Sequence, residues 1–154
     1  MRLLNIAMLL FFISISPFTV AQNNAKINWS ANGNNYTVIK DGNITQVDPG
    51  TGSETVIIKK EQLTIKETKV YLEPQSYAFN NNYTRILIFT NTAKVWRYKT
   101  RGDYWILDIL SDKLRKLGEG LANQSLMFAK LSPDGKKVAY VSEHNIYVEE
   151  ISSV

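Results

Sequence analysis

Leu131-Ser132-Pro133-Asp134-Gly135 is the third copy of a pattern that decides the fold of this chain. The earlier copies are Trp29-Ser30-Ala31-Asn32-Gly33 and Phe79-Asn80-Asn81-Asn82-Tyr83, so the copies begin 50 and then 52 residues apart. Each copy is an apolar residue and a polar turn, followed by an alternating apolar run. Short strands that recur about every 40 to 50 residues are typical of β-propeller blades. The sequence therefore predicts an all-β fold.

Most of the chain after residue 28 consists of short runs rich in β-branched and aromatic residues, separated by Asn, Gly, Asp and Pro. The expected strands are Tyr36–Lys40, Asn43–Val47, Glu54–Lys59, Ser76–Phe79, Arg85–Phe89, Tyr104–Asp108, Leu126–Leu131, Lys137–Val141 and Asn145–Glu149. They make about two full blades and part of a third over residues 29–154. Since a closed ring needs at least about four blades, we expect an incomplete propeller of antiparallel strands.

The first 21 residues have the pattern of a secretory signal peptide. Arg2 supplies a positive charge, an apolar stretch follows, and Thr19-Val20-Ala21 offers small residues for cleavage after Ala21. An uncleaved anchor helix is the alternative, but two serines and a proline interrupt a stretch already shorter than the roughly 20 residues of a membrane span. We therefore expect a secreted or periplasmic protein without a stable membrane span, and a flexible segment at 22–28.

The composition argues against several classes of function. The 154 residues carry 18 basic and 14 acidic side chains, a net charge of +4, and the basic residues are scattered. Binding of nucleic acid needs a concentrated basic stripe, so no nucleic-acid partner is expected. The chain has no cysteine and one histidine, His144. We therefore expect no cofactor, no metal and no thiol chemistry.

The sequence also lacks the residues of a serine hydrolase site. The nucleophile elbow Gly-x-Ser-x-Gly is absent. His144 lies in a Ser-Glu-His-Asn turn between two expected strands, where a solvated side chain is the simpler interpretation. A second turn, at Ser111-Asp112-Lys113, is expected to be a hairpin tip, although residues 110–117 could also form a helical turn. No catalytic residue is predicted.

Two stretches resemble a known family. Lys94-Val95-Trp96-Arg97-Tyr98, followed by Asp103-Tyr104-Trp105-Ile106-Leu107-Asp108, resembles the N-terminal propeller of the dipeptidyl peptidase IV family, serine peptidases of the prolyl oligopeptidase type. The later run 131–141, followed by Asn145-Ile146-Tyr147-Val148, is similar to the next blade of that propeller. Ser-Pro-Asp-Gly-Lys is common among unrelated propellers, whereas the Trp-Arg element at this distance before Tyr-x-Ile/Leu-x-Asp is much more specific.

The resemblance implies a fold, an activity and one binding residue. Members of the family join an eight-bladed propeller to a C-terminal α/β-hydrolase domain and release dipeptides, or tripeptides in one branch, after proline or alanine. It implies that Arg97 points into the central cavity and donates hydrogen bonds to a carbonyl of the bound peptide, for which a guanidinium fork is suited. The alternative is a solvated or salt-bridged strand residue. We assign Trp96 to packing.

Other positions depart from the family's pattern. Lys99 stands where relatives often have serine, which affects the fine shape of the pocket. The family binds the substrate's terminal ammonium through a pair of adjacent glutamates. Glu149-Glu150 is not identified with that pair, because it is expected to end a blade strand.

The leading interpretation is the N-terminal propeller portion of a secreted serine exopeptidase, in which the propeller gates and positions short peptides with a free N-terminus. The chain as given is expected to be inactive, because the catalytic α/β-hydrolase domain lies outside it. The resemblance also allows a homodimer of the intact enzyme. The alternatives are a non-catalytic secreted propeller used for binding or as a scaffold, and a small complete β-domain.

Overall fold

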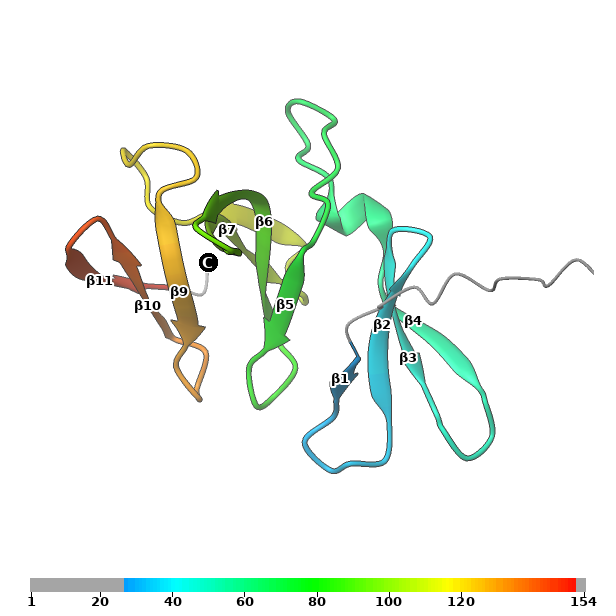
Figure 1. Ribbon diagram of the computed structural model, residues 1–154. Helices are drawn as coiled ribbons and strands as arrows, with labels where there is room; N and C mark the ends of the chain where they lie inside the picture. Colours follow the sequence, from blue (N-terminus) through cyan, green and yellow to red (C-terminus); the bar gives the residue numbers. More distant parts are fainter. Residues whose placement is uncertain (1–26, 152–154) are drawn as a thin grey trace, which may run out of the picture.

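The computed structural model of this chain describes residues 27–151, whose strands form three groups that stand side by side (Figure 1). The predicted signal peptide falls on residues outside this part, as do residues 22–26, and it stays a prediction. The first strand begins at Asn28, the last residue of the segment that we expected to be flexible.

The first group is a four-stranded antiparallel sheet in the order β1-β2-β3-β4. Its strands are β1 (Asn28–Trp29), β2 (Tyr36–Lys40), β3 (Asn43–Val47) and β4 (Glu54–Ile58). A short 3-10 helix, η1 (Lys60–Leu63), and a loop lead from this sheet to the second group.

The second and third groups follow the same antiparallel plan. Their strands are β5 (Ser76–Phe79), β6 (Arg85–Val95), β7 (Tyr98–Asp108) and β8 (Lys113–Lys116), then β9 (Leu126–Leu131), β10 (Lys137–Ser142) and β11 (Asn145–Glu150). Within residues 27–151, the only strand pairing between the two groups is that of Arg101 with Met127 and of Gly102 with Leu126. Residues 27–151 thus form a four-stranded sheet and a seven-stranded sheet, and they contain no α-helix. This confirms the all-β prediction. The seven-stranded sheet consists of a four-stranded part, β5–β8, and a three-stranded part, β9–β11, which we call the middle sheet and the last sheet.

The turn that repeats in the sequence also repeats in the structure. Gly33, Tyr83 and Gly135 occupy the same position of the three copies, and their φ angles are 71°, 54° and 73°. Glycine adopts this left-handed conformation without a steric penalty. Tyr83 adopts it as a bulky residue, and its ring lies 4.9 Å from that of Phe79. The three turns are therefore one structural repeat.

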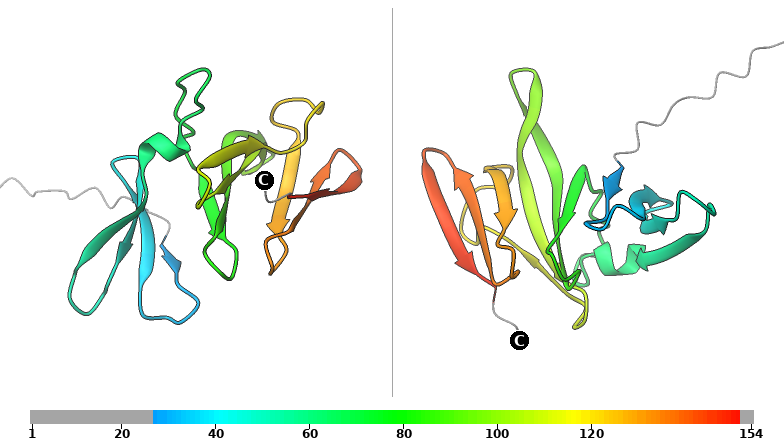
Figure 2. Two further views of the ribbon diagram at one scale, coloured as in Figure 1. Left: turned by 180° about the vertical axis from the view of Figure 1, so that it is seen from behind. Right: turned by 90° about the horizontal axis from the view of Figure 1, so that it is seen from below.

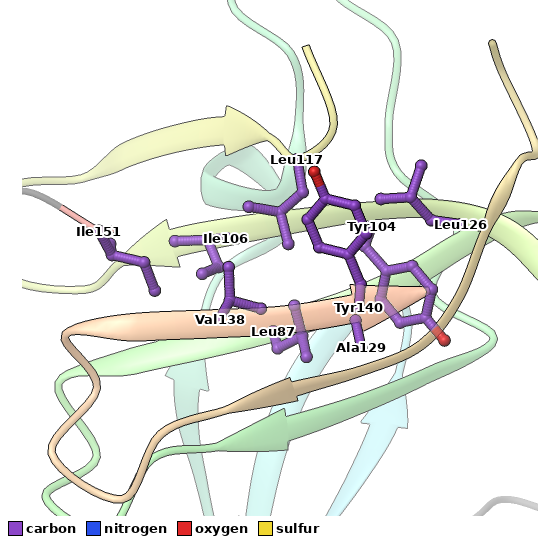
Figure 3. Packing of buried hydrophobic residues seen from close by; sticks show 9 residues of the cluster. All are labelled: Leu87, Tyr104, Ile106, Leu117, Leu126, Ala129, Val138, Tyr140 and Ile151. Carbon is purple, nitrogen blue, oxygen red and sulfur yellow. The ribbon is translucent and has the colours of Figure 1, made fainter. Parts of the chain in front are cut away.

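Two hydrophobic cores lie between the three groups, one on each face of the middle sheet. Successive residues of a strand point to opposite faces, so Leu87 and Ile106 contribute to one core while Ile86 and Leu107 contribute to the other. Figure 3 shows the core between the second and third groups, which consists of Leu87, Tyr104, Ile106, Leu117, Leu126, Ala129, Val138, Tyr140 and Ile151. The middle sheet is therefore covered on both sides.

The structure extends some of the predicted strands and adds others. β6 and β7 are each 11 residues long, because they continue through polar residues whose sequence does not alternate. The short strands β1 and β8 were not predicted. The turn at Ser111-Asp112 joins β7 to β8, as expected of a hairpin tip, and the alternative helical turn at 110–117 is not formed.

Candidate functional site

The long hairpin of β6 and β7 projects beyond the rest of the middle sheet (Figure 2, right). We call its outer part, residues 91–101, the arm. Val95 and Tyr98 form its last paired residues, so Trp96 and Arg97 make a two-residue turn at the tip. Trp96 has a φ of 60°, as the turns of tight hairpins require. The Trp-Arg element singled out in the sequence is thus the end of a projecting hairpin.

The prediction that Trp96 packs in the core is wrong. Its side chain is 95% exposed, and Tyr98 is 73% exposed. The prediction treated Trp96 as an interior strand residue, whereas a residue in a hairpin turn has no neighbouring strand to cover it. Arg97 is exposed beside it. Two aromatic rings and a guanidinium are therefore free to meet a ligand at the tip.

The arm concentrates positive charge. Lys94 and Lys99 are paired directly across the hairpin, and Arg97 and Arg101 follow within a few residues. Like charges in facing positions of an antiparallel pair are destabilising. No ion pair within residues 27–151 joins these four cations to a carboxylate. The arm can therefore offer several unneutralised donors to an electron-rich ligand.

A buried carboxylate, Asp103, anchors the base of the arm. Its Oδ2 accepts a hydrogen bond from Asn91 Nδ2 at 2.8 Å, and its Oδ1 accepts one from the backbone N–H of Gln124 at 2.9 Å. Lys116 Nζ lies 3.3 Å from the same Oδ1. Gln124 Nε2 in turn donates to Asn91 Oδ1 at 2.9 Å. We call these four residues, Asn91, Asp103, Lys116 and Gln124, the Asp103 clamp.

Close packing next to the clamp requires glycine at position 102. A Cβ there would lie 2.5 Å from Cε2 of Phe89 and 2.7 Å from the carbonyl oxygen of Thr90. Phe89 is held by stacking on Tyr104, with 4.5 Å between ring centroids, and burial raises the pKa of Tyr104. The backbone of β7 is thus pressed against β6 where the arm leaves the sheet.

A hollow of about 400 Å³ lies beside the base of the arm. It is lined by residues of β6, β7 and the linker that follows η1, and its polar lining includes Glu73, Asn91 and Asp103. Trp105 and Tyr71 form aromatic walls. This hollow and the arm place polar and aromatic groups on one region of the middle sheet.

The remaining residues considered in the sequence have structural settings. His144 lies exposed in the turn between β10 and β11, as predicted. Glu149 and Glu150 are the last two residues of β11, in agreement with the prediction that this pair ends a strand. Glu149 Oε1 accepts hydrogen bonds from Tyr140 Oη at 2.7 Å and Gly118 N at 2.8 Å. Burial opposes the ionisation of Glu149, but these bonds and Arg115 hold its pKa below the usual value. It links the second and third groups.

Between residues 27 and 151, no three histidine, cysteine or carboxylate side chains gather closely enough to hold a metal ion. Over the same residues, no helix has the length and apolarity to span a membrane.

The three groups of strands, packed side by side through apolar faces, define a segment of a β-propeller. Residues 80–154 match the family described as the dipeptidyl peptidase IV (DPP IV) N-terminal region. The second half of the chain is therefore similar to the N-terminal region of the dipeptidyl peptidase IV family, in agreement with the resemblance found in the sequence.

Individual relatives agree with this assignment. The chain is 30% identical over 95 residues to a probable dipeptidyl peptidase 4 of Aspergillus fumigatus, covering 62% of this chain and 12% of the relative. It is 33% identical over 70 residues to a probable dipeptidyl-aminopeptidase B of Penicillium rubens, covering 46% of this chain and 8% of the relative. The chain thus spans a small part of the length of these relatives.

A solved structure supports the fold. The crystal structure of Porphyromonas gingivalis dipeptidyl peptidase 4 superposes with a TM-score of 0.69 and 22% identity, covering 82% of this chain and 18% of that one. At this identity the likeness concerns the fold alone. It confirms the prediction of a partial propeller.

The tip of the arm is marked in the sequence by the Trp-Arg element, whereas the base of the arm was not predicted. Asp103, Asn91 and Gln124 come from two strands and a loop, and no spacing along the chain relates them. One signal was present, because Asp103 is a charged residue directly before an alternating apolar strand. A carboxylate at such a position is buried only if it has partners.

Proposed function

We propose that this chain is part of the propeller of a secreted serine exopeptidase that releases dipeptides, or tripeptides, after proline or alanine. The propeller limits access to short peptides and positions them, and Arg97 donates hydrogen bonds to a carbonyl of the bound peptide. The hydrolytic groups belong to sequence outside this chain. The observation that carries the proposal is the exposed Trp96-Arg97 tip in a segment related to dipeptidyl peptidases.

The chemistry of the tip supports this role for Arg97. Its guanidinium has no carboxylate partner within residues 27–151, so its donors are available. A hydrogen bond from a charged group contributes about 1.5–3 kcal/mol, which corresponds to roughly 10- to 150-fold in affinity. A peptide carbonyl held at this point would fix the register of the substrate.

The first test is the coding sequence beyond codon 154, followed by an assay of the intact gene product on Gly-Pro-p-nitroanilide. We expect an open frame that encodes a Gly-x-Ser-x-Gly elbow, and release of the dipeptide. Arg97→Ala should raise KM about tenfold or more, because it removes a charge-assisted hydrogen bond. Arg115→Ala is the control, since Arg115 is an exposed arginine of β8 that lies outside the arm. Equal effects of the two variants would overturn the role of Arg97.

A second candidate function is a non-catalytic secreted propeller that binds peptides or serves as a scaffold. The exposure of Arg97 favours it, because the side chain faces solvent rather than a closed pocket. A side chain that lines a water-filled channel is also exposed, so this observation leaves the enzyme as the better-supported proposal. A stop codon directly after codon 154, together with a secreted product that binds a tripeptide such as Ile-Pro-Ile without cleaving it, would establish the second function instead.

A further inference from the structure

We infer that the Asp103 clamp is a positioning device, which holds the arm at a fixed angle to the middle sheet and thereby sets where Arg97 meets the peptide. The part of this inference that concerns peptide binding by Arg97 rests on the proposed function. The clamp itself rests on geometry that is independent of any ligand.

The arm needs such a device because its strands are irregular where it leaves the sheet. The register between β6 and β7 shifts twice, between Thr90 and Ala93 and again between Ala93 and Lys94. Asn91 lies within the first irregularity with a φ of 45°. Bulges interrupt the ladder and bend the strands. Without other contacts, the arm would be free to swing about this point.

Residues from three separate elements meet at the base of the arm and form hydrogen bonds there. Asn91 belongs to β6, Asp103 to β7, and Gln124 to the loop that leads into β9. Asp103 is 5% exposed, so its carboxylate is largely withdrawn from water, which strengthens the hydrogen bonds that it accepts. Each oxygen of the carboxylate is bound to a different element, which fixes the two strands of the hairpin to the loop beside them.

Backbone pairing extends the clamp. β7 pairs with β9 only at Arg101 and Gly102, directly before Asp103. The clamp therefore sits where the second and third groups of strands meet. A shift of one blade against the next would be transmitted to the arm through Asp103, over the few residues that separate it from Arg97.

The negative charge of Asp103 is balanced at the base of the arm and not by the cations of the arm. Lys116 Nζ is its one cationic partner within ion-pair distance among residues 27–151. The four arm cations lie beyond this reach, so the carboxylate holds the base of the arm without neutralising the tip.

The test compares Asp103→Asn with Asp108→Asn in the full chain. Both residues belong to β7 and both pair with a cation, but Asp108 lies at the end of the strand that is far from the arm, bound to Arg85. The readout is the ¹⁵N order parameter of residues 94–99. In the unmodified chain we expect values near 0.85, as for rigid backbone, and in Asp103→Asn values below about 0.6. Asp108→Asn should leave the arm at the unmodified value.

Asn91→Gly is the second variant if Asp103→Asn does not fold. Glycine keeps the backbone conformation with positive φ and removes the amide that binds Asp103, so it should also loosen the arm. An arm that stays ordered in whichever of these two variants folds, or one that loosens equally in Asp108→Asn, would overturn the inference.

A kinetic experiment on the intact gene product separates this inference from the proposed function. If the clamp positions Arg97, Asp103→Asn should raise KM about as much as Arg97→Ala, and the double variant should add little, because coupled residues are non-additive. If Arg97→Ala leaves KM unchanged, the proposed function fails while the order parameters still decide the clamp. If Arg97→Ala raises KM and Asp103→Asn neither raises it nor loosens the arm, the clamp alone fails.

Discussion

The middle sheet and the last sheet both contain strands with large apolar residues, but their faces meet different surroundings. In β6 the consecutive residues Ile86, Leu87 and Ile88 are at most 4% exposed. In β11, Ile146 and Val148 are 78% and 63% exposed. The difference lies in the neighbours, because a core covers each face of the middle sheet and only one face of the last. An apolar residue in a blade is therefore stabilising only where an adjacent sheet covers it.

The largest expected effect on stability comes from replacing isoleucine by alanine on a covered face of the middle sheet, compared with the same replacement on the open face of the last sheet. Ile88→Ala should lower the free energy of unfolding by about 2–5 kcal/mol, since it leaves a cavity in a packed core. Ile146→Ala, the matched control on the open face of β11, should change it by about 1 kcal/mol or less. Urea unfolding of both variants measures the difference. Similar losses would mean that the face of β11 is covered in solution.

If Ile88→Ala prevents folding, Ile88→Val gives a milder version of the same experiment. It removes one methyl group and should lower the free energy of unfolding by about 0.5–1.5 kcal/mol. Ile146→Val should have no measurable effect.

The repeated turn offers the next comparison. Gly135→Ala should destabilise the chain by more than Gly33→Ala, although both backbones have nearly the same φ. An alanine at either position costs about 1–2 kcal/mol because of its left-handed conformation. At 135 the Cβ would also lie 2.5 Å from Asn80 Nδ2, whereas nothing lies within 4 Å at 33.

Asn80 cannot move away easily from an alanine at 135. Its Oδ1 accepts hydrogen bonds from the backbone N–H groups of Thr84 and Arg85. The melting temperatures of Gly33→Ala and Gly135→Ala, measured by thermal unfolding, should therefore differ. Equal decreases would mean that the third turn does not contact the middle sheet in solution.

The contact between the middle and last sheets should depend on pH through Glu149. Its pKa is lower in the folded chain than the ordinary value of 4.5, so its stabilising contribution is fully present above that value. The contribution is lost as the pH falls below about 4.5 and through the folded pKa. Urea midpoints between pH 6 and pH 3 should therefore fall less steeply in Glu149→Gln. Glu150→Gln, which changes the exposed neighbour, is the control. Its urea midpoint should fall with pH as steeply as that of the unmodified chain.

The smallest effect concerns the arm. Lys94 faces Lys99 across the hairpin, whereas Lys137 in the last sheet faces Glu150, with 3.5 Å between the charged atoms. Lys94→Glu should raise the free energy of unfolding by about 0.2–1 kcal/mol, because it replaces a like-charge pair with an opposite one. The same change should weaken peptide binding if the arm's charge serves that role. A gain in stability without any loss of binding would assign the charge of Lys94 to solubility alone.

Much of the fold could be predicted because it is local. Tyr36–Lys40 and Asn43–Val47 were predicted as strands from short runs rich in β-branched and aromatic residues, and the observed strands have the same bounds. The candidate site was predicted in part. The Trp-Arg element marks the tip of the arm, but the exposure of Trp96 and the role of Asp103 could not be read from its spacing.

The sequence by itself determined most of the strands, the turns and the period of the repeat, since these depend on residues close together in the chain. It also carried the resemblance to the dipeptidyl peptidase IV family. Only the tertiary structure decided which faces are buried, how far β6 and β7 extend, and how Asn91, Asp103 and Gln124 meet. These features depend on contacts between residues that lie 12 to 33 positions apart. Such contacts form only when separate strands and loops pack together, so no local pattern encodes them.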